Sequence, residues 1–304
     1  MISWNRKGLI FKNIFKNRSH TQLPIAIKLK KKIRVYYSSR DYLGRSEPFY
    51  FDLSLDLKKI IKCGKKPILK LGEIGSFDES GIMPTGIIKT SKNYLLYYIG
   101  WQKSFSVPFI NSLGLAISKN GLNFKKYSES PILNRNDNER FFFGTAHAVK
   151  NKEGYLMYYL SGIKWKRINK RIEPFYDIKI AKSKNGYDWK QIKKTAIILK
   201  KNEGGVCSAS VIKKDKKYFM YYCYRGKSNY RNNKKYSYRI GCASSKDLIK
   251  WKRADHNFNL ETLENSWESK MMAYPNIIKL NKNYLMFYNG NEFGKSGIGL
   301  AISN

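Results

Sequence analysis

Five carboxylates stand where a side chain could do chemistry, because each lies at the end of a predicted strand or in the loop before one. They are Asp41, Asp78, Glu79, Glu203 and Glu268. Two carboxyl groups held close together can divide the roles of general acid and general base. Each also has a structural interpretation. Asp41 follows Arg40 and could form an ion pair, and the SFDESG stretch of residues 75–80 is rich in turn residues.

The same strand ends carry residues that could bind a ligand. They are His20, Gln22, Arg40, Arg45, Trp101, His147, Trp165, Ser208, Arg225, Arg239, Tyr274 and Asn289. Flat aromatic faces together with carboxylates and amides suit sugar rings and their hydroxyls. His20 opens a strand and could donate to a hydroxyl or a phosphate, whereas His147 lies mid-strand, where a buried structural histidine is the commoner outcome.

One loop is longer than its counterparts. Residues 225–239, RGKSNYRNNKKYSYR, are rich in positive charge. Long loops in compact folds are usually functional or disordered. The segment is therefore either an anion-binding lid or a solvated charged run.

A repeat positions these residues. Five segments carry paired aromatics, and the first aromatic of each pair is Tyr36, Tyr97, Tyr158, Tyr221 or Phe287, at spacings of 61, 61, 63 and 66 residues. Aromatic pairs of this kind suit the half-buried surface of a strand. Such regular spacing indicates five copies of one supersecondary unit.

Each copy reads as four antiparallel strands. A strand precedes each aromatic pair, and Lys-Asn-Gly or Ser-Lys-Asp turns introduce an outer strand that opens with Phe124, Trp189 or Trp251. Repeated meanders of this length predict an all-β, five-bladed β-propeller. The structural rival is a β-sandwich, which does not explain five matching copies.

The last copy lacks its outer strand, since the chain stops at Asn304. SWNRKGLIF (3–11) matches that strand, with Trp4 in the position of Trp189 and Trp251. We therefore expect one propeller domain over residues 1–304, in which residues 3–11 complete the last blade and leave no free edge.

The charge is strongly positive. There are 59 Lys and Arg against 22 Asp and Glu, a formal net charge of +37. Such a surface attracts phosphorylated substrates, anionic lipid or nucleic acid. Because the basic residues are spread along the chain, a codon-biased surface without a partner is the favoured interpretation. Peripheral contact with an anionic membrane is the alternative, and specific nucleic-acid binding is not expected.

Cysteines and targeting signals narrow the class further. Cys63, Cys207, Cys223 and Cys242 have no CxxC spacing, and three histidines are scattered over the chain. We expect reduced thiols, no metal and no cofactor. The N-terminus lacks the apolar segment of a signal peptide, and no stretch is long enough to span a membrane, so a soluble, cytoplasmic protein is expected.

The motifs resemble the five-bladed propeller clan of glycosidases, which includes arabinanases, invertases, levansucrases and mannoside phosphorylases. The nearest likeness is to predicted glycosyl hydrolases of surface-polysaccharide gene clusters. The matching stretches cover essentially the whole chain: SHTQLP (19–24), SSRDYLGRS (38–46), GSFDESGIMP (75–84), YYIGWQ (97–102), NSLGLAIS (111–118), NEGG (202–205), YRG (224–226), YSYRIG (236–241) and MFYNGNEFGKSG (286–297).

The resemblance implies Glu203 as general acid, and Asp41 and Asp78 are further catalytic candidates by their positions. Glycosidases hold two carboxyl groups about 5–5.5 Å apart for retention and about 6.5–9.5 Å apart for inversion. This chain departs from the pattern, because His20-Thr21-Gln22 stands where the clan offers an Asp. Ser208 and Ala273 replace an Arg and a Glu of closer relatives. The two-carboxylate mechanism is therefore in doubt.

The function these features favour is a carbohydrate-active enzyme acting on a glycosidic bond. A nucleotide-activated or lipid-linked sugar of surface-polysaccharide biosynthesis fits the positive charge. A glycosyltransferase or glycoside phosphorylase on the same fold is one alternative, and a non-catalytic glycan-binding propeller is another. The expected partner is a sugar, sugar phosphate or nucleotide sugar.

Overall fold

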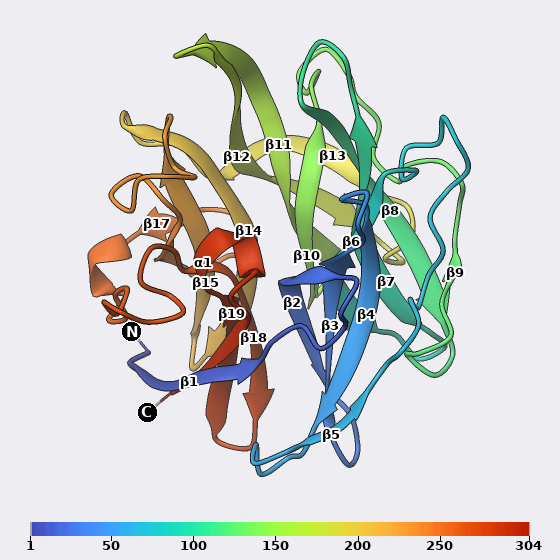
Figure 1. The fold of residues 1–304 in the computed structure, drawn as a ribbon, viewed down its shortest axis with the longest axis vertical. Helices are drawn as coiled ribbons and strands as arrows, with labels where there is room; N and C mark the ends of the chain where they lie inside the picture. Colours follow the sequence, from blue (N-terminus) through green and yellow to red (C-terminus); the bar gives the residue numbers. More distant parts are fainter. Residues whose placement is uncertain (1, 304) are drawn as a thin grey trace.

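The structure, a computed structural model, describes residues 2–303 as a protein built almost wholly of β-strands (Figure 1). Within that range the helical segments are η1 (Asp255–Asn257) and α1 (Asn291–Gly294). Neither is long and apolar enough to cross a membrane. The strands form three hydrogen-bonded sheets, one of four strands and two of eight.

The four-stranded sheet joins the two ends of the described chain. Its antiparallel order is β1 (Trp4–Phe11), β20 (Ile298–Ser303), β19 (Asn283–Asn289) and β18 (Ala273–Leu280). The register pairs Trp4 with Ser303 and Phe11 with Ile298. The N-terminal segment therefore lies beside the last strand, as its sequence indicated.

Each eight-stranded sheet consists of two antiparallel meanders. One sheet holds β2 (Ser19–Lys28), β3 (Ile33–Arg40), β4 (Ser46–Leu53) and β5 (Ile60–Cys63), then β6 (Gly81–Lys89), β7 (Tyr94–Lys103), β8 (Phe109–Ser118) and β9 (Lys125–Lys126). The other holds β10 (Phe143–Asn151), β11 (Gly154–Ile168), β12 (Arg171–Ser183) and β13 (Lys190–Ile197), then β14 (Glu203–Lys214), β15 (Lys217–Gly226), β16 (Arg239–Ser245) and β17 (Lys252–Arg253).

A single parallel bridge links the two meanders of each eight-stranded sheet. Ser46 pairs with Gly81 in one sheet, and Tyr176 pairs with Gly205 in the other. The ladders inside the meanders are far longer. Each meander is therefore a structural unit that meets its neighbours chiefly through side chains.

The first strands of the meanders contact one another in cyclic order: β2 with β6, β6 with β10, β10 with β14, β14 with β18, and β18 with β2. Side chains bridge these seams to backbone N–H groups. Thr85 Oγ1 accepts from Ala146 N at 2.9 Å, Thr145 Oγ1 from Ser208 N at 2.8 Å, and Ser210 Oγ from Ile277 N at 2.9 Å. Each of these side chains gives a buried backbone N–H group at the seam a hydrogen-bond acceptor from the neighbouring meander.

The paired aromatics pack between neighbouring meanders, as their spacing suggested. The Tyr97 hydroxyl donates to Gly186 O, and the Tyr158 hydroxyl donates to Leu248 O, both at 2.7 Å. Each accepting carbonyl belongs to a hairpin turn of the next meander. Gly186 has φ +84°, the left-handed conformation that the Lys-Asn-Gly turn predicted.

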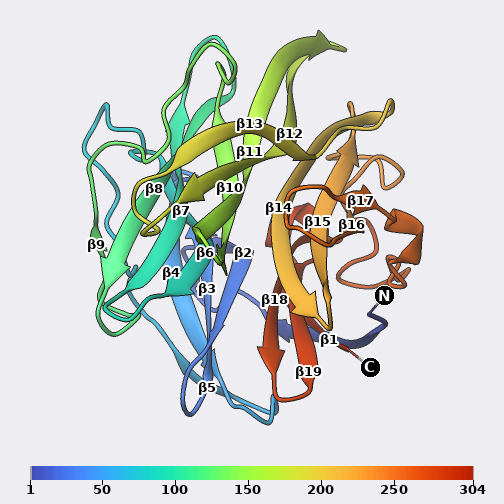
Figure 2. The same cartoon turned by 180° about the vertical axis from the view of Figure 1, so that it is seen from behind.

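Trp4 makes the corresponding contact for the four-stranded sheet. Its ring meets Tyr221 edge-on at 5.3 Å, much as Trp189 meets Tyr97 at 5.8 Å. Its backbone N–H also donates to Asn259 Oδ1 at 2.9 Å. Figure 2 shows this sheet from behind, with β1 near the marked N and C termini.

Replacing Trp4 with alanine should destabilise the protein by about 3–5 kcal/mol, because it empties a buried aromatic site at a seam. Urea denaturation followed by tryptophan fluorescence or circular dichroism measures the change. Leu9→Ala is the matched control, since Leu9 lies on the same strand but is 42% exposed. Equal losses from the two variants would contradict the role given to Trp4.

Candidate functional site

A cavity of about 410 Å³ lies where the first strands of the meanders come together. Each of these strands contributes to its lining. The contributors are Gln22 and Leu23 from β2, Met83 from β6, Thr145 from β10, Cys207 from β14 and Tyr274 from β18. The sequence predicted lining positions for Gln22 and Tyr274. A site built from every meander is the expected binding place in a cyclic β-fold.

Each of the five first strands has a register irregularity beside the cavity. In three of them a non-glycine residue takes the left-handed conformation there: Leu23 at φ +56°, Ser208 at +57° and Tyr274 at +58°. Bulges re-aim side chains and often stand next to functional sites. Leu23 and Tyr274 line the cavity themselves, and Ser208 follows the lining residue Cys207, so the strained backbone lies at or next to the cavity wall.

An aromatic wall forms one side of the cavity. Trp101 and Phe109 have ring centroids 4.6 Å apart, and Phe109 meets Phe142 at 5.5 Å. Trp165 packs on Phe142 at 5.0 Å and supports the wall from β11. Flat aromatic faces of this kind suit the C–H faces of a sugar ring. Trp101 and Trp165 were predicted from the sequence, whereas Phe109 and Phe142 were missed.

Arg40 brings a positive charge to the same cavity. It stands at the end of β3 and lines the cavity, and its Nη2 donates to Gln22 Oε1 at 2.9 Å. Within residues 2–303 it takes part in no ion pair. Burial lowers the pKa of this guanidinium, which reflects the cost of enclosing an uncompensated charge. A ligand anion would remove that cost.

Two tyrosines and a buried arginine form a hydrogen-bonded chain in the wall. Arg225 Nε donates to the Tyr176 hydroxyl at 2.9 Å, and that hydroxyl is hydrogen-bonded to the hydroxyl of Tyr238. Arg225 also donates to Pro174 O at 2.6 Å and lies 3.9 Å above the ring of Tyr230. The sequence predicted a site role for Arg225 but missed both tyrosines of the chain.

The chain leaves one hydroxyl proton unused. Tyr176 and Tyr238 carry two phenolic protons, and the bond between them uses one; Arg225 supplies only donors. The described chain offers the other proton no further acceptor. Burial raises the pKa of Tyr238 well above its usual range, so the phenol stays protonated at neutral pH. Because both rings line the cavity, this proton is available to a ligand.

Asn111 supplies an acceptor. Its side chain lines the cavity and is only 8% exposed, and its Oδ1 accepts no hydrogen bond within the described chain. A buried carbonyl oxygen left without a donor costs roughly 1–3 kcal/mol. A ligand hydroxyl would satisfy it.

No carboxylate lines this cavity among residues 2–303. Glu203, the sequence choice for general acid, forms a two-pronged ion pair with Arg253, at 2.7 and 2.8 Å. It also accepts from Lys200 N at 2.8 Å. The geometry gives Glu203 a structural partner, and its catalytic role remains a prediction.

Asp78 and Glu268 lie close to the paired aromatics instead. Asp78 accepts from the Tyr98 hydroxyl at 3.1 Å and pairs with Lys126 at 2.9 Å. Glu268 is fully buried and pairs with Arg6 at 2.6 Å. Another meander repeats the arrangement, with Glu139 accepting from the Tyr159 hydroxyl at 2.9 Å. This recurrence indicates a role in packing.

Asp41 organises a turn at the rim. Its Oδ2 accepts from Arg45 Nε at 2.8 Å, and its Oδ1 accepts from Arg45 N at 2.8 Å. Burial opposes ionisation of this carboxyl, but these hydrogen bonds hold its pKa below the usual range. The ion pair foreseen beside Arg40 thus forms with Arg45. Glu79 accepts from Gly75 N at 2.7 Å, as a turn residue would.

His20 lies outside the cavity, in an adjoining groove of about 460 Å³ that shares Arg231 and Phe293 with it. Burial, then the charges of Arg40 and Lys295, lower the pKa of His20 to about 4. The imidazole is therefore neutral at physiological pH.

The remaining predicted residues have internal partners. His147 Nε2 accepts from Val211 N at 3.1 Å, and Arg239 donates to Lys270 O at 2.9 Å. Asn289 holds β2 through Leu23 N at 2.8 Å and Thr21 O at 2.7 Å. Ser208 contributes its backbone to the seam with Thr145.

The long loop predicted as an anion-binding lid contributes Tyr230, Arg231 and Tyr238 to the cavity lining. Arg231 forms an ion pair with Glu173 at 3.1 Å. In the sequence, only the unusual length of this loop indicated that its residues could belong to the site. The lid function itself remains a prediction.

Comparisons of the sequence with known proteins find relatives without an assigned function. No family model matches the chain. It is 29% identical over 308 residues to the uncharacterized protein Rv1502 of Mycobacterium tuberculosis strain H37Rv, and the match covers 99% of each chain. The uncharacterized protein MT1551 of strain CDC 1551 has the same identity and coverage.

Comparison with solved structures shows which fold the chain shares. A glycosyl hydrolase from Bacteroides ovatus matches with TM-score 0.74 and 15% identity, covering 99% of this chain and 93% of that one. A thermostable family-43 glycoside hydrolase matches at 0.70 and 17%, covering 98% and 91%. A structure from work on the GH130 mannoside phosphorylases matches at 0.68 and 16%, covering 99% and 93%. The chain has the β-propeller fold of these enzymes.

The buried histidine His147 should make stability fall in mild acid. Burial lowers its pKa from 6.5 to about 4, so the unfolded chain binds a proton first as pH drops. The free energy of unfolding should decrease by about 3 kcal/mol between these two pH values through this residue, and stay level above pH 6.5. Protonation also removes the acceptor for Val211 N.

Urea denaturation at a series of pH values measures this effect. His147→Gln should remove the share of the decline that comes from His147 and leave the share of His20, whose pKa is also lowered to about 4. A neutral amide can accept the same bond from Val211 N. His256→Gln, which changes an exposed histidine, is the control and should leave the decline intact. An unchanged pH profile in His147→Gln would refute the assignment.

Proposed function

We propose that this protein is a carbohydrate-active enzyme that acts on the glycosidic bond of an activated, phosphate-bearing sugar held in the cavity. The observation that carries the proposal is Arg40, a partly buried guanidinium that has no ion pair within the described chain and lines the same cavity as the aromatic wall. The wall suits the sugar, and the guanidinium suits a phosphate. Nucleotide-activated and lipid-linked sugars both carry these two groups.

The scaffold proposed for this activity is a single five-bladed propeller in which each meander is one blade. The cyclic contacts from β2 round to β18 and back support a closed ring. The pairing of β1 with β20 supports closure by the N-terminal strand. A cytoplasmic location and a role in polysaccharide biosynthesis stay predictions from the sequence.

The lack of a carboxylate in the described cavity lining favours glycosyl transfer from a sugar phosphate, which includes the synthetic direction of a phosphorylase, over hydrolysis or phosphorolysis of an unactivated glycoside. Hydrolysis of an unactivated glycoside needs a carboxylic acid to protonate the departing oxygen. A phosphate leaves as a stable anion and needs charge and hydrogen-bond donors instead. Arg40 offers the charge, and the spare proton of the Tyr176–Tyr238 pair offers the donor.

The second candidate is a glycan-binding propeller without catalysis, which the same absence of carboxylates also favours. The two functions differ in turnover alone. A thermal-shift screen with sugar phosphates, nucleotide sugars and neutral oligosaccharides identifies the ligand class, and product analysis then separates them. If no sugar of any class stabilises the protein, both candidates fail.

Replacing Arg40 with methionine should weaken binding of phosphate-bearing sugars about 10–100-fold, because a charge-assisted hydrogen bond contributes roughly 1.5–3 kcal/mol. Binding of neutral sugars should change little. Isothermal titration measures both. Arg135→Met, which removes an exposed arginine outside the cavity, is the control. An equal loss for neutral and charged ligands would contradict the phosphate role.

Replacing Tyr238 with phenylalanine should lower kcat about 10–100-fold for the activated sugar that the screen identifies, with a smaller change in KM. The ring and its packing remain, and the hydrogen bond to the departing oxygen is lost. Tyr127→Phe, at an exposed tyrosine, is the control. A KM effect with unchanged kcat would leave Tyr238 as a binding residue only.

A further inference from the structure

Several large apolar side chains are exposed to solvent on loops next to the cavity. Ile74 and Phe105 are 100% and 106% exposed, Tyr42 is 84% exposed and Leu43 is 50% exposed. We call these four the rim apolar residues. They lie on three separate loops, so they form isolated tips instead of one continuous patch.

The rim apolar residues are tied to the cavity by chain and by hydrogen bond. Tyr42 and Leu43 follow the lining residue Arg40, and Phe105 lies in the hairpin between the lining residues Trp101 and Phe109. The loop that carries Ile74 is joined to the same hairpin, since Gln102 Nε2 donates to Gly75 O at 3.5 Å. The tips therefore surround one side of the cavity.

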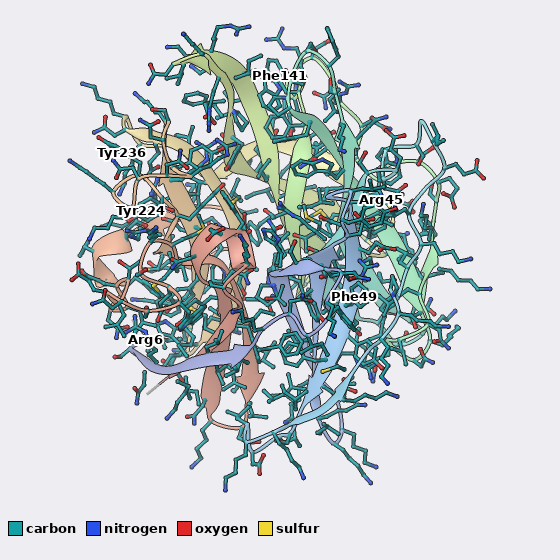
Figure 3. All side chains as sticks on the ribbon, viewed as in Figure 1. Arg6, Arg45, Phe49, Phe141, Tyr224 and Tyr236 are labelled. Atoms are coloured by element: carbon teal, nitrogen blue, oxygen red, sulfur yellow. The ribbon has the colours of Figure 1, made fainter. Side chains whose placement is uncertain are left out.

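Basic residues stand on the same rim. The tip of the β11–β12 hairpin carries five exposed cations, which are Lys164, Lys166, Arg167, Lys170 and Arg171. Residues 164–171 contain no acidic residue. In both views the β7–β8 and β11–β12 hairpins end at the same end of the molecule (Figures 1 and 2). Figure 3 labels Arg45 and Tyr236 in the upper half of that view.

We propose that this rim is a docking surface for an anionic lipid bilayer. Separate apolar tips can each enter the interfacial region of a bilayer without a matching protein surface. Cations beside them gain about 1 kcal/mol each near anionic headgroups. The net charge of +37 gives the long-range attraction. A protein partner would instead favour one contiguous apolar patch.

The orientation has a consequence for access to the cavity. With the rim on the bilayer, the cavity opens beside the headgroups, where a sugar attached to a membrane lipid would be found. The docking proposal does not depend on the proposed enzymatic activity, because it rests on exposed residues that the cavity does not use.

Sedimentation with lipid vesicles tests the proposal on the full chain. The protein should bind phosphatidylcholine vesicles that contain phosphatidylglycerol, and bind less as salt rises. The double variant Ile74→Ser/Phe105→Ser should bind at least about tenfold more weakly, since each lost apolar tip removes buried area. Ile61→Ser is the matched control, at a 50% exposed isoleucine on β5, and should bind like the wild type.

Two results would overturn the proposal. One is no binding to phosphatidylglycerol vesicles at low salt. The other is unchanged binding by Ile74→Ser/Phe105→Ser, which would reduce the attraction to charge alone. Arg40→Met separates this inference from the proposed function, because it should lose affinity for phosphate-bearing sugars and keep vesicle binding.

Discussion

The whole structure depends on how one meander holds the next. Long hydrogen-bonded ladders run inside each meander, but between first strands the backbone donors are met by single side chains such as Thr85, Thr145 and Ser210. Tyrosine hydroxyls reach into the turns of the neighbouring meander and fix the outer parts. The cavity is the space that these seams leave, so its lining comes from all of the meanders.

Much of the fold could be predicted from the sequence, because its signals are local and repeated. Paired aromatics every 61 to 66 residues located the meanders, and Trp4 identified the strand that completes the last sheet. The site was harder, because its residues meet through distant contacts. Glu203 forms an ion pair with Arg253, and Asp78 forms one with Lys126. Neither pair could be predicted from the spacing of the residues along the chain. Tyr176 and Tyr238 were missed because nothing in the sequence distinguishes them from the many tyrosines that pack between meanders.

The chemistry of the cavity differs from what a pair of carboxylates would give. Its polar groups include two guanidiniums, a spare phenolic proton, amides and hydroxyls, and aromatic rings line the same space. The carboxylates that sequence reasoning sought are present nearby, but Asp78, Glu203 and Glu268 are held by cations outside the lining. A fold shared with glycoside hydrolases therefore encloses a cavity whose described lining holds cationic and neutral polar groups.

The pairing of β1 with β20 also constrains how the chain is made. Trp4 N bonds to a side chain 255 residues later, so the contact cannot form until those residues have left the ribosome. During synthesis the first strand has no partner, and its edge is open to unwanted pairing. Its exposed positions, which include Asn5 and Lys7, keep it soluble through that interval. Contacts so distant in sequence also predict slow folding.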